Sequence, residues 1–551
     1  MNIQLRLPTK PLEKGVVYTK SWVVELILDF VGYRVEADLA TLVAVEPAAG
    51  EGAFLIPMLR RLLASLRSHG RTIEDARRAI IAYEIDKDAA DLARQLVVAE
   101  LVAHGFSRPV AARAAKRWIV EADYLLSAAT APRADIVVGN PPYIRYDDLG
   151  PGMFQTYHAV CPTMVGRCDI YVGFIEAALC QLKDGGRLGF ICADRWMRSA
   201  YGAQLRRFVA ANASVDVVIE MHDAPAFEND VAAYPAVTVI RRAPQGPVVV
   251  ASAGPTAGPV QEGSLADAIV ELAGKRRDRL PGFRAANLER WYRGDTPWPW
   301  AEPEALDLLQ HLEARFRPLE DVQAGTRVGI GVATGADSVF VTTDSNCVEP
   351  DRLLPLAMVY DGRNGAVAWS GHYLVDPWGP DDKLLELSPF PKLAAYYEAH
   401  AAELKRRNIA SRHQAGWYRT IDRVTHSLLK REKLYFADMK LQAHPFLDRG
   451  QTYPHHNVYY VVSDTWDMEV LGGLLLSKIA ELFVASYCVK MRGGTLRFQA
   501  QYLRRIRVPD PMTLSAAIAE RLRVAFRQYD RGAATAAALH AYGITELPTA
   551  A

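Results

Sequence analysis

The tetrapeptide Asn140-Pro141-Pro142-Tyr143 combines oxygen acceptors, a flat aromatic face and a rigid backbone directly after an apolar run. Consecutive prolines fix φ and remove backbone donors, while their carbonyl groups remain as acceptors. The amide oxygen of Asn140 and the carbonyl oxygen of Pro141 can therefore accept both hydrogens of one planar amino group. This favours a pyramidal nitrogen and stabilises the positive charge that grows on it during attack on a methyl group. The pattern predicts methyl transfer to an exocyclic or amide nitrogen of a planar group that stacks on Tyr143. The alternative is that the tetrapeptide only forms a rigid turn at the end of the strand.

Acidic residues follow three successive predicted strands. Glu46 opens the small-residue turn EPAAGEG, whose glycines allow a ligand to approach the backbone closely. Glu84 and Asp123 end the next two strands and could accept hydrogen bonds from ribose hydroxyls and from an exocyclic amine. The turn lacks the spacing of dinucleotide-binding and phosphate-binding loops. Each acid alone could be a solvated strand end, but together they predict a nucleoside-bearing cofactor without pyrophosphate, and S-adenosylmethionine is the natural candidate.

Residues 1–245 alternate short apolar runs with amphipathic stretches, which predicts a doubly wound, Rossmann-like α/β sheet. Such a sheet binds ligands outside the carboxyl ends of its strands, where the acids and the tetrapeptide are expected to meet. The predicted strands are Thr41–Val45, Ala79–Tyr83, Trp118–Val120, Asp135–Val138, Arg187–Ala193, Val215–Ile219 and Ala236–Arg241, and the predicted helices include Gly52–Leu66 and Asp88–Ala103.

The character of the sequence changes after this sheet. Residues 246–300 are predicted to connect two domains, because the stretch 243–263 is rich in Gly, Pro and Ala, with one short strand at Val248–Val250. Residues 301–551 lose the strand–helix alternation and gain Arg and Trp. This predicts a second domain of mixed α+β type that ends in a helical tail.

Composition excludes several classes of protein. The chain has 551 residues, of which 50% are hydrophobic and 23% charged, so it is globular and long enough for two or three domains. Its 64 Lys and Arg against 63 Asp and Glu give a net charge of +1, which indicates no partner. Because we find no membrane-spanning run, no signal peptide and no C-x-x-C pair among the 6 cysteines, we expect a cytoplasmic protein with no membrane contact and no metal site.

The order of these motifs resembles the gamma class of adenine-N6 DNA methyltransferases, the TaqI-like type, over nearly the whole chain. Beside the motifs above, Tyr18-Thr19 and the stretch Asp169–Phe174 carry the resemblance. It implies S-adenosyl-L-methionine as the cofactor and a C-terminal target-recognition domain over residues 301–551. The implied cofactor-binding residues are Thr19, Glu46, Ala48, Gly50, Glu84, Asp123, Tyr124 and Phe174. The implied catalytic residues are Asn140, Pro141, Pro142, Tyr143 and a second aromatic that stacks on the target, Phe227.

The tetrapeptide alone does not specify DNA, because glutamine-N5 protein methyltransferases and some RNA methyltransferases have similar ones. Local basic clusters in the second half favour DNA. Ten basic residues accompany four acidic ones between residues 403 and 440, and six basic residues lie between 490 and 507 without an acid. A solvated charged surface is the alternative. The candidates for DNA contact are Arg419, Lys433, Arg492, Arg497, Arg504 and Arg505.

The sequence therefore predicts a site-specific DNA adenine-N6 methyltransferase that acts on a flipped base. Its expected role is the modification enzyme of a restriction-modification or similar defence system. Double-stranded DNA is the predicted partner. A separate restriction endonuclease is a second one, since the nuclease-like spacing at Asp438-Met439-Lys440 lacks a convincing upstream acid. The alternatives are a methyltransferase for RNA or for a protein glutamine, and a non-catalytic DNA-binding subunit.

Overall fold

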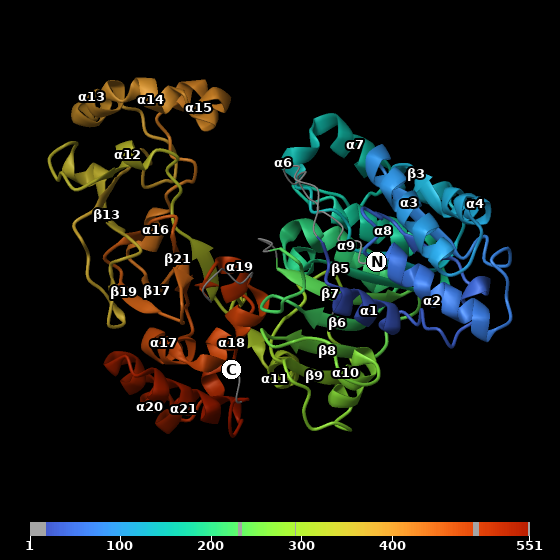
Figure 1. Ribbon diagram of the computed structural model, residues 1–551. Coiled ribbons are helices and arrows are strands. Elements are labelled where there is room, and N and C mark those ends of the chain that lie inside the picture. The colour runs from blue at the N-terminus through green and yellow to red at the C-terminus, as the bar shows by residue number, and fades with distance from the viewer. Residues whose placement is uncertain (1–17, 230–233, 293, 489–494, 549–551) are drawn as a thin grey trace. The chain divides into compact units, whose positions relative to one another are not determined.

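The computed structural model describes residues 18–229, 234–292, 294–488 and 495–548, which form two compact units divided after Glu304 (Figure 1). Arg492, one of the predicted DNA contacts, lies outside the described residues. Among the helices that the structure describes, none has both the length and the apolar character that a membrane crossing requires.

The first unit is built on a nine-stranded sheet in the order β3-β2-β1-β4-β5-β7-β6-β8-β9. The strands from β3 to β5 are parallel, and β7 is antiparallel to both β5 and β6. The predicted doubly wound fold is confirmed. In chain order, the first strands are β1 (Ala44–Glu46), β2 (Ile80–Glu84), β3 (Ile119–Glu121), β4 (Ala134–Gly139), β5 (Leu182–Ala193), β6 (Ser214–Glu220) and β7 (Pro235–Arg241).

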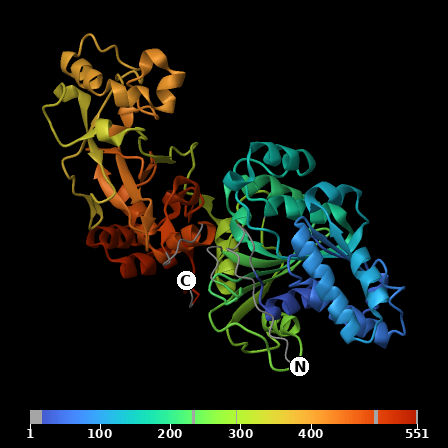
Figure 2. The same ribbon diagram turned by 45° about the horizontal axis from the view of Figure 1, so that its top comes forward.

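Both faces of this sheet are apolar, which is why helices cover each of them. Along β5, Gly189 faces α1, where a Cβ would lie 2.8 Å from Ile27 Cγ2. The alternate residues Leu188 and Phe190 are buried as well. Figure 2 shows the strands of this unit, blue to green, lying between helices. The helices in this part of the chain are α1 (Ser21–Phe30), α2 (Leu55–Ser68), α3 (Lys87–Ala103), α4 (Arg108–Trp118), α5 (Tyr124–Ser127), α6 (Tyr146–Leu149), α7 (Pro151–Val160), α8 (Tyr171–Gln181) and α9 (Ala203–Asn212).

Residues 246–300 do not form the predicted connection. They extend the first sheet, because β8 (Val248–Ala253) pairs with β6 and β9 (Phe283–Leu288) pairs with β8. Between these strands, α10 (Leu265–Ala273) packs on both and adds its apolar face to the core. The Gly- and Pro-rich sequence forms the turns around β8, and the first unit therefore extends to Glu304.

The second unit joins two small mixed sheets. The six-stranded sheet has the order β11-β21-β17-β19-β15-β14, and the four-stranded sheet has the order β12-β16-β13-β20. The strands are β10 (Arg317–Pro318), β11 (Arg327–Ile330), β12 (Val341–Thr342), β13 (Leu353–Ala357), β14 (Gly362–Arg363), β15 (Ala366–Val367), β16 (Tyr373–Val375), β17 (Glu432–Ala437), β18 (Met439–Lys440), β19 (Phe446–Arg449), β20 (Tyr453–Pro454), β21 (Val458–Val462), β22 (Leu496–Arg497) and β23 (Arg507–Val508).

Helices lie at both ends of the second unit, with α13, α14 and α15 at one end and α20 and α21 at the other (Figure 1). The crossing of α17 on α20 is so close that a Cβ at Gly473 would lie 2.4 Å from the carbonyl oxygen of Leu522. The helices are α11 (Pro303–Arg315), α12 (Asp337–Phe340), α13 (Pro391–Ala399), α14 (Ala401–Lys405), α15 (Asn408–Arg412), α16 (His426–Leu429), α17 (Met468–Leu476), α18 (Lys478–Tyr487), α19 (Ala500–Leu503), α20 (Ala516–Gln528) and α21 (Arg531–Tyr542).

Candidate active site

Asn140 follows the last residue of β4, at the carboxyl end of the parallel strands. Its side-chain Nδ2 donates a hydrogen bond of 3.2 Å to Thr19 Oγ1. Because the amide group is planar, this contact directs Oδ1 away from Thr19. The following residue, Pro141, has a fixed φ and no N–H donor, so its carbonyl oxygen is its only backbone hydrogen-bonding group. The strand end therefore presents acceptors of fixed orientation.

A short stretch of backbone pairing holds Thr19 beside the loop that follows β6. Thr19 and Phe227 form an antiparallel bridge. Lys20 N–H donates to Ala226 O at 2.9 Å, and Glu228 N–H donates to Tyr18 O at 3.0 Å. The N-terminal segment thus positions the contact of Asn140 and also fixes the loop that carries Phe227.

Two aromatic side chains meet at this strand end. The rings of Tyr143 and Phe227 are 6.4 Å apart at 87°, an edge-to-face contact, and both side chains remain partly exposed. Burial of the Tyr143 hydroxyl raises its pKa well above the usual value, so the phenol stays neutral. An aromatic pair of this kind can hold a flat heterocycle by stacking.

Glu46, at the end of β1, is 1% exposed. Burial and the nearby Glu84 raise the pKa of Glu46 well above the usual value of a carboxyl group. Its Oε2 has no hydrogen-bond partner among the described residues. A buried carboxylate without a partner is costly, so this atom is suited to a ligand that brings a positive charge.

Glu84 orders the turn that follows Glu46. Its two carboxylate oxygens accept hydrogen bonds from Gly50 N–H at 2.7 Å and from Asp86 N–H at 2.9 Å. Gly50 has φ +50°, and apart from its chain neighbours no atom of the described residues lies within 4 Å of the position that its Cβ would take. Ala48, in the same turn, is half-buried. Glu84 therefore fixes the backbone of this turn, and the turn remains open to a ligand at Gly50.

Asp123 lies two residues after β3, as the N-cap of α5, and contacts a residue that sequence reasoning missed. Its Oδ1 accepts from Leu125 N–H at 2.9 Å, and its Oδ2 accepts from the Tyr157 hydroxyl at 2.7 Å. Beside it, the rings of Tyr124 and Phe174 pack together with centroids 5.6 Å apart, and both are buried. Tyr157 lies within α7, where no strand-end pattern in the sequence draws attention to it.

The structure brings the predicted residues of the first unit into three groups at the same edge of the sheet. Gly139 joins two of these groups, because its Cβ would lie 3.9 Å from Glu46 Cγ while Asn140 is the next residue. The groups are Thr19, Asn140, Pro141, Pro142, Tyr143 and Phe227; Glu46, Ala48, Gly50 and Glu84; and Asp123, Tyr124 and Phe174.

A buried ionic network, which the sequence did not reveal, lies between the ends of β5 and β6. His222 Nε2 is 2.9 Å from Asp194 Oδ2, and His222 Nδ1 is 2.6 Å from Glu220 Oε1. Asp194 also pairs with the buried Arg198. Burial lowers the pKa of His222, but the hydrogen bonds with Asp194 and Glu220 outweigh it and raise this pKa to about 9. His222 is therefore charged and anchors the loop that leads to Phe227.

We expect His222→Gln to destabilise the protein at pH 6 by about 1–3 kcal/mol, because it removes the cation that lies between the buried carboxylates of Asp194 and Glu220. The stabilisation by His222 is complete below its unfolded pKa of about 6.5 and is lost as the pH rises through about 9. The difference in the free energy of unfolding between wild type and His222→Gln should therefore be smaller at pH 10 than at pH 6. Urea unfolding at both pH values measures this difference. His540→Gln, at an exposed position, is the control. A deficit of equal size at both pH values would contradict a role of the histidine charge.

Lys433 is a wrong prediction among the DNA contacts. Its side chain is 0% exposed, and Nζ lies 2.6 Å from Asp448 Oδ2, which is equally buried. The ammonium also donates to the carbonyl oxygens of Leu429 and Arg431. Its position in β17 turns the side chain inward, where it cannot reach a phosphate.

The other basic candidates that the structure describes have partners within the second unit. Arg497 pairs with Asp438, and Arg504 donates to Glu320 at 3.1 Å and to Val328 O at 2.9 Å. Arg505 lies over the Tyr487 ring at 4.3 Å, and Arg419 lies over the Trp378 ring at 5.1 Å. These contacts orient the guanidinium groups, and DNA contact by Arg419, Arg497, Arg504 and Arg505 remains a prediction.

The sheet order, with β7 antiparallel between β5 and β6, places the tetrapeptide after β4 at the carboxyl edge of the parallel strands. The structure of the type IIL restriction-modification enzyme MmeI in complex with DNA has a similar fold, with a TM-score of 0.57 and 12% identity over 96% of this chain and 74% of that chain. A family model described as Eco57I restriction-modification methylase matches residues 81–227, from β2 to Phe227.

Whole-length relatives identify the family. The chain is 39% identical to the type II methyltransferase M.XhoI of Xanthomonas vasicola, over 97% of this chain and 98% of that protein. It is 40% identical to the type II methyltransferase M.PaeR7I of Pseudomonas aeruginosa, over 97% of this chain and 92% of that protein. The chain therefore belongs to the type II methyltransferase family of restriction-modification systems.

Proposed function

We propose that this protein is a site-specific DNA methyltransferase that transfers a methyl group to the N6 amine of adenine. The observation that supports this most directly is the strand end after β4. There the Asn140 amide is oriented by Thr19, and the Tyr143 and Phe227 rings meet. A polar acceptor pair beside two aromatic rings matches a flat target that carries an amino group.

The cofactor in this proposal is S-adenosyl-L-methionine, which would supply a methyl group on a positively charged sulfur. The buried Glu46 Oε2, with no hydrogen-bond partner among the described residues, fits the ammonium group of this molecule. The open turn at Gly50 lets a ligand approach the backbone, and Glu84 would accept hydrogen bonds from the ribose hydroxyls. Asp123 would accept from the adenine amine in place of the Tyr157 hydroxyl.

The target adenine would stack on Tyr143 and Phe227 after it leaves the duplex. Unstacking costs a few kcal/mol, and stacking on the aromatic pair offsets part of this. Asn140 Oδ1 and Pro141 O would accept both hydrogens of the amine, which localises the nitrogen lone pair. Positive charge grows on that nitrogen during transfer, so these acceptors bind the transition state more strongly than the ground state.

The second unit would read the recognition sequence, and the protein would act as the modification enzyme of a restriction-modification system. Membership of the type II methyltransferase family supports this role. A separate restriction endonuclease of the same specificity would be its functional partner.

Methyl transfer can be tested directly with the full-length protein, tritium-labelled S-adenosyl-L-methionine and unmodified genomic DNA. We expect label in duplex DNA and N6-methyladenine in its nucleoside digest. RNA and a glutamine-containing protein are the parallel substrates. Label in either of these and none in DNA would contradict the proposed target.

We also expect Arg504→Ala and Arg505→Ala to weaken DNA binding and to reduce the salt slope of the affinity by about 1 each, because each loses one phosphate contact. Fluorescence anisotropy at several salt concentrations measures both quantities. Arg527→Ala, at an exposed arginine of α20 that pairs with Glu469, is the control and should behave as wild type. Unchanged affinity and slope in both test variants would remove these arginines from the interface.

A further inference from the structure

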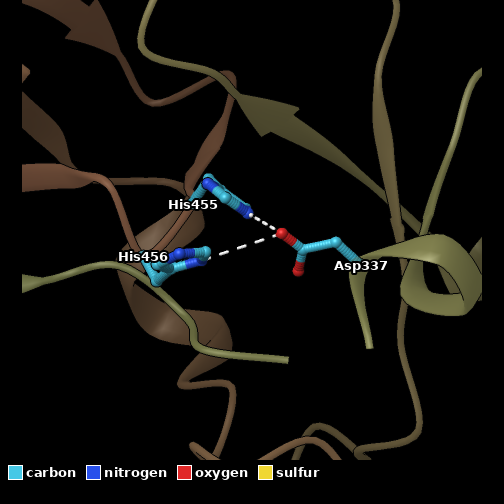
Figure 3. Close-up of side chains that lie close together, drawn as sticks. All are labelled: Asp337, His455 and His456. Atoms are coloured by element: carbon cyan, nitrogen blue, oxygen red, sulfur yellow. Dashed lines mark hydrogen bonds and ion pairs between the residues drawn. The ribbon is translucent and has the colours of Figure 1, made fainter. Parts of the chain in front are cut away.

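Three potential metal ligands converge in the second unit, although the sequence shows no metal-binding spacing. His455 and His456 follow β20, and Asp337 opens α12 (Figure 3). His455 Nε2 lies 3.0 Å from Asp337 Oδ2, and His456 Nδ1 lies 4.0 Å from the same oxygen. One ligand atom from each residue falls within 4.8 Å of the other two. Asp337 is 118 positions from His455, so only the fold brings the ligands together.

An ordinary histidine–aspartate hydrogen bond accounts for only part of this cluster. It explains His455, which is 3% exposed and bonded to Asp337. It does not explain His456, whose buried Nδ1 has no hydrogen-bond partner among the described residues. Figure 3 shows both imidazole rings turned toward one carboxylate oxygen. A cation between the three atoms would satisfy all of them.

The surroundings hold the carboxylate in place and leave it accessible. The second oxygen of Asp337 accepts a hydrogen bond from Thr334, whose hydroxyl also accepts from Ala336 N–H at 3.1 Å. Outer hydrogen bonds of this kind orient the ligands of metal sites. The Asp337 side chain is 47% exposed, so an ion can enter from solvent and keep a water molecule.

We propose that Asp337 Oδ2, His455 Nε2 and His456 Nδ1 bind a divalent transition-metal ion of the zinc type, with water as the remaining ligand. Two histidines and a carboxylate form a usual ligand set for Zn²⁺. Tetrahedral ligands at zinc distances are about 3.4 Å apart. The distances of 3.0 and 4.0 Å from the Asp337 oxygen lie on either side of this value.

Such an ion would be structural, because it would join two segments that already pair through their backbones. Val332 bridges His455 in parallel, and Val332 N–H donates to Pro454 O at 2.9 Å. A Cβ at Gly331 would lie 2.2 Å from His455 O, so the two segments approach as closely as backbones can. The ion would fix the loop before α12 on this pairing and stabilise the second unit.

The test uses the full chain after treatment with a chelator and its removal. Titration with CoCl₂, followed by the visible absorption of Co²⁺ and by calorimetry, should show one ion per chain, and ZnCl₂ should displace it. The ion should also raise the melting temperature by several degrees. In Asp337→Asn and His456→Asn, affinity should fall by more than the 10- to 100-fold that is typical for the loss of an outer partner. His413→Asn, at an exposed histidine of the same unit, should bind as wild type does.

Either of two results would overturn the proposal. One is the absence of stoichiometric binding by the wild-type chain, and the other is unchanged affinity in both Asp337→Asn and His456→Asn. Circular dichroism of the metal-free variants shows whether they fold. If His456→Asn does not fold, Asp337→Asn, which keeps the shape of the side chain, decides the question alone.

Discussion

Replacing Asn140 with alanine should lower the rate of methyl transfer by at least about 10²- to 10³-fold, the loss typical when one oriented polar group is removed from a transition state. The affinity for the cofactor should change little, because the amide acts on the target nitrogen. Single-turnover incorporation of labelled methyl groups into DNA measures the first quantity, and calorimetry measures the second.

Thr19→Val provides a graded comparison for this variant. It keeps the Asn140 acceptor but removes the hydroxyl that holds the amide at 3.2 Å. We therefore expect a rate between those of wild type and Asn140→Ala. Incorporation by Asn140→Ala at the wild-type rate would remove the basis of the proposed mechanism.

The second large effect is expected at Glu46, where Glu46→Gln should weaken cofactor binding by about 10- to 150-fold. This corresponds to the loss of one charge-assisted hydrogen bond, about 1.5–3 kcal/mol. The glutamine has the same shape but cannot neutralise an ammonium group. Calorimetric titration with S-adenosyl-L-methionine measures the change, and Glu36→Gln, at an exposed carboxylate of the same unit, is the control.

The raised pKa of Glu46 also fixes the sign of two pH effects. Cofactor binding to wild type should strengthen as the pH rises toward this pKa, because the bound cation favours the carboxylate. The stability that the protonated side chain provides is complete below the unfolded pKa and is lost as the pH rises through the folded one. Glu46→Gln should therefore be more stable than wild type at high pH while binding the cofactor less tightly. A parallel loss of both properties would indicate misfolding instead.

The parts of the fold that the sequence predicted are those governed by local patterns. Apolar runs of strand length marked β4 and β7 within one or two residues, and the tetrapeptide after β4 indicated chemistry by its composition. The connection at residues 246–300 was wrong because Gly and Pro density marks turns as well as linkers. The pattern of the chain does not show whether a turn-rich stretch leaves a sheet or adds strands to it.

The contacts that escaped prediction join residues far apart in the chain or depend on which side of a strand faces inward. In the sequence, Lys433 is one more basic residue of a basic cluster. Only the structure shows that it is buried against Asp448 and is absent from the surface. Tyr157 had no reason to be paired with Asp123 before α7 was placed beside α5, the short helix that Asp123 caps. His222 follows a predicted strand and could have been considered by the strand-end rule, but its partner Asp194 follows another strand.

The bridge between Thr19 and Phe227 should make the two halves of the proposed catalytic centre energetically dependent on each other. Thr19 belongs to the proposed methyl-donor side and Phe227 to the nucleobase side, so a ligand that orders one segment reduces the entropy that the other must lose. Linkage then requires reciprocity, and the donor and the DNA should tighten each other's binding by the same factor. An enzyme built in this way favours the ternary complex over either binary one.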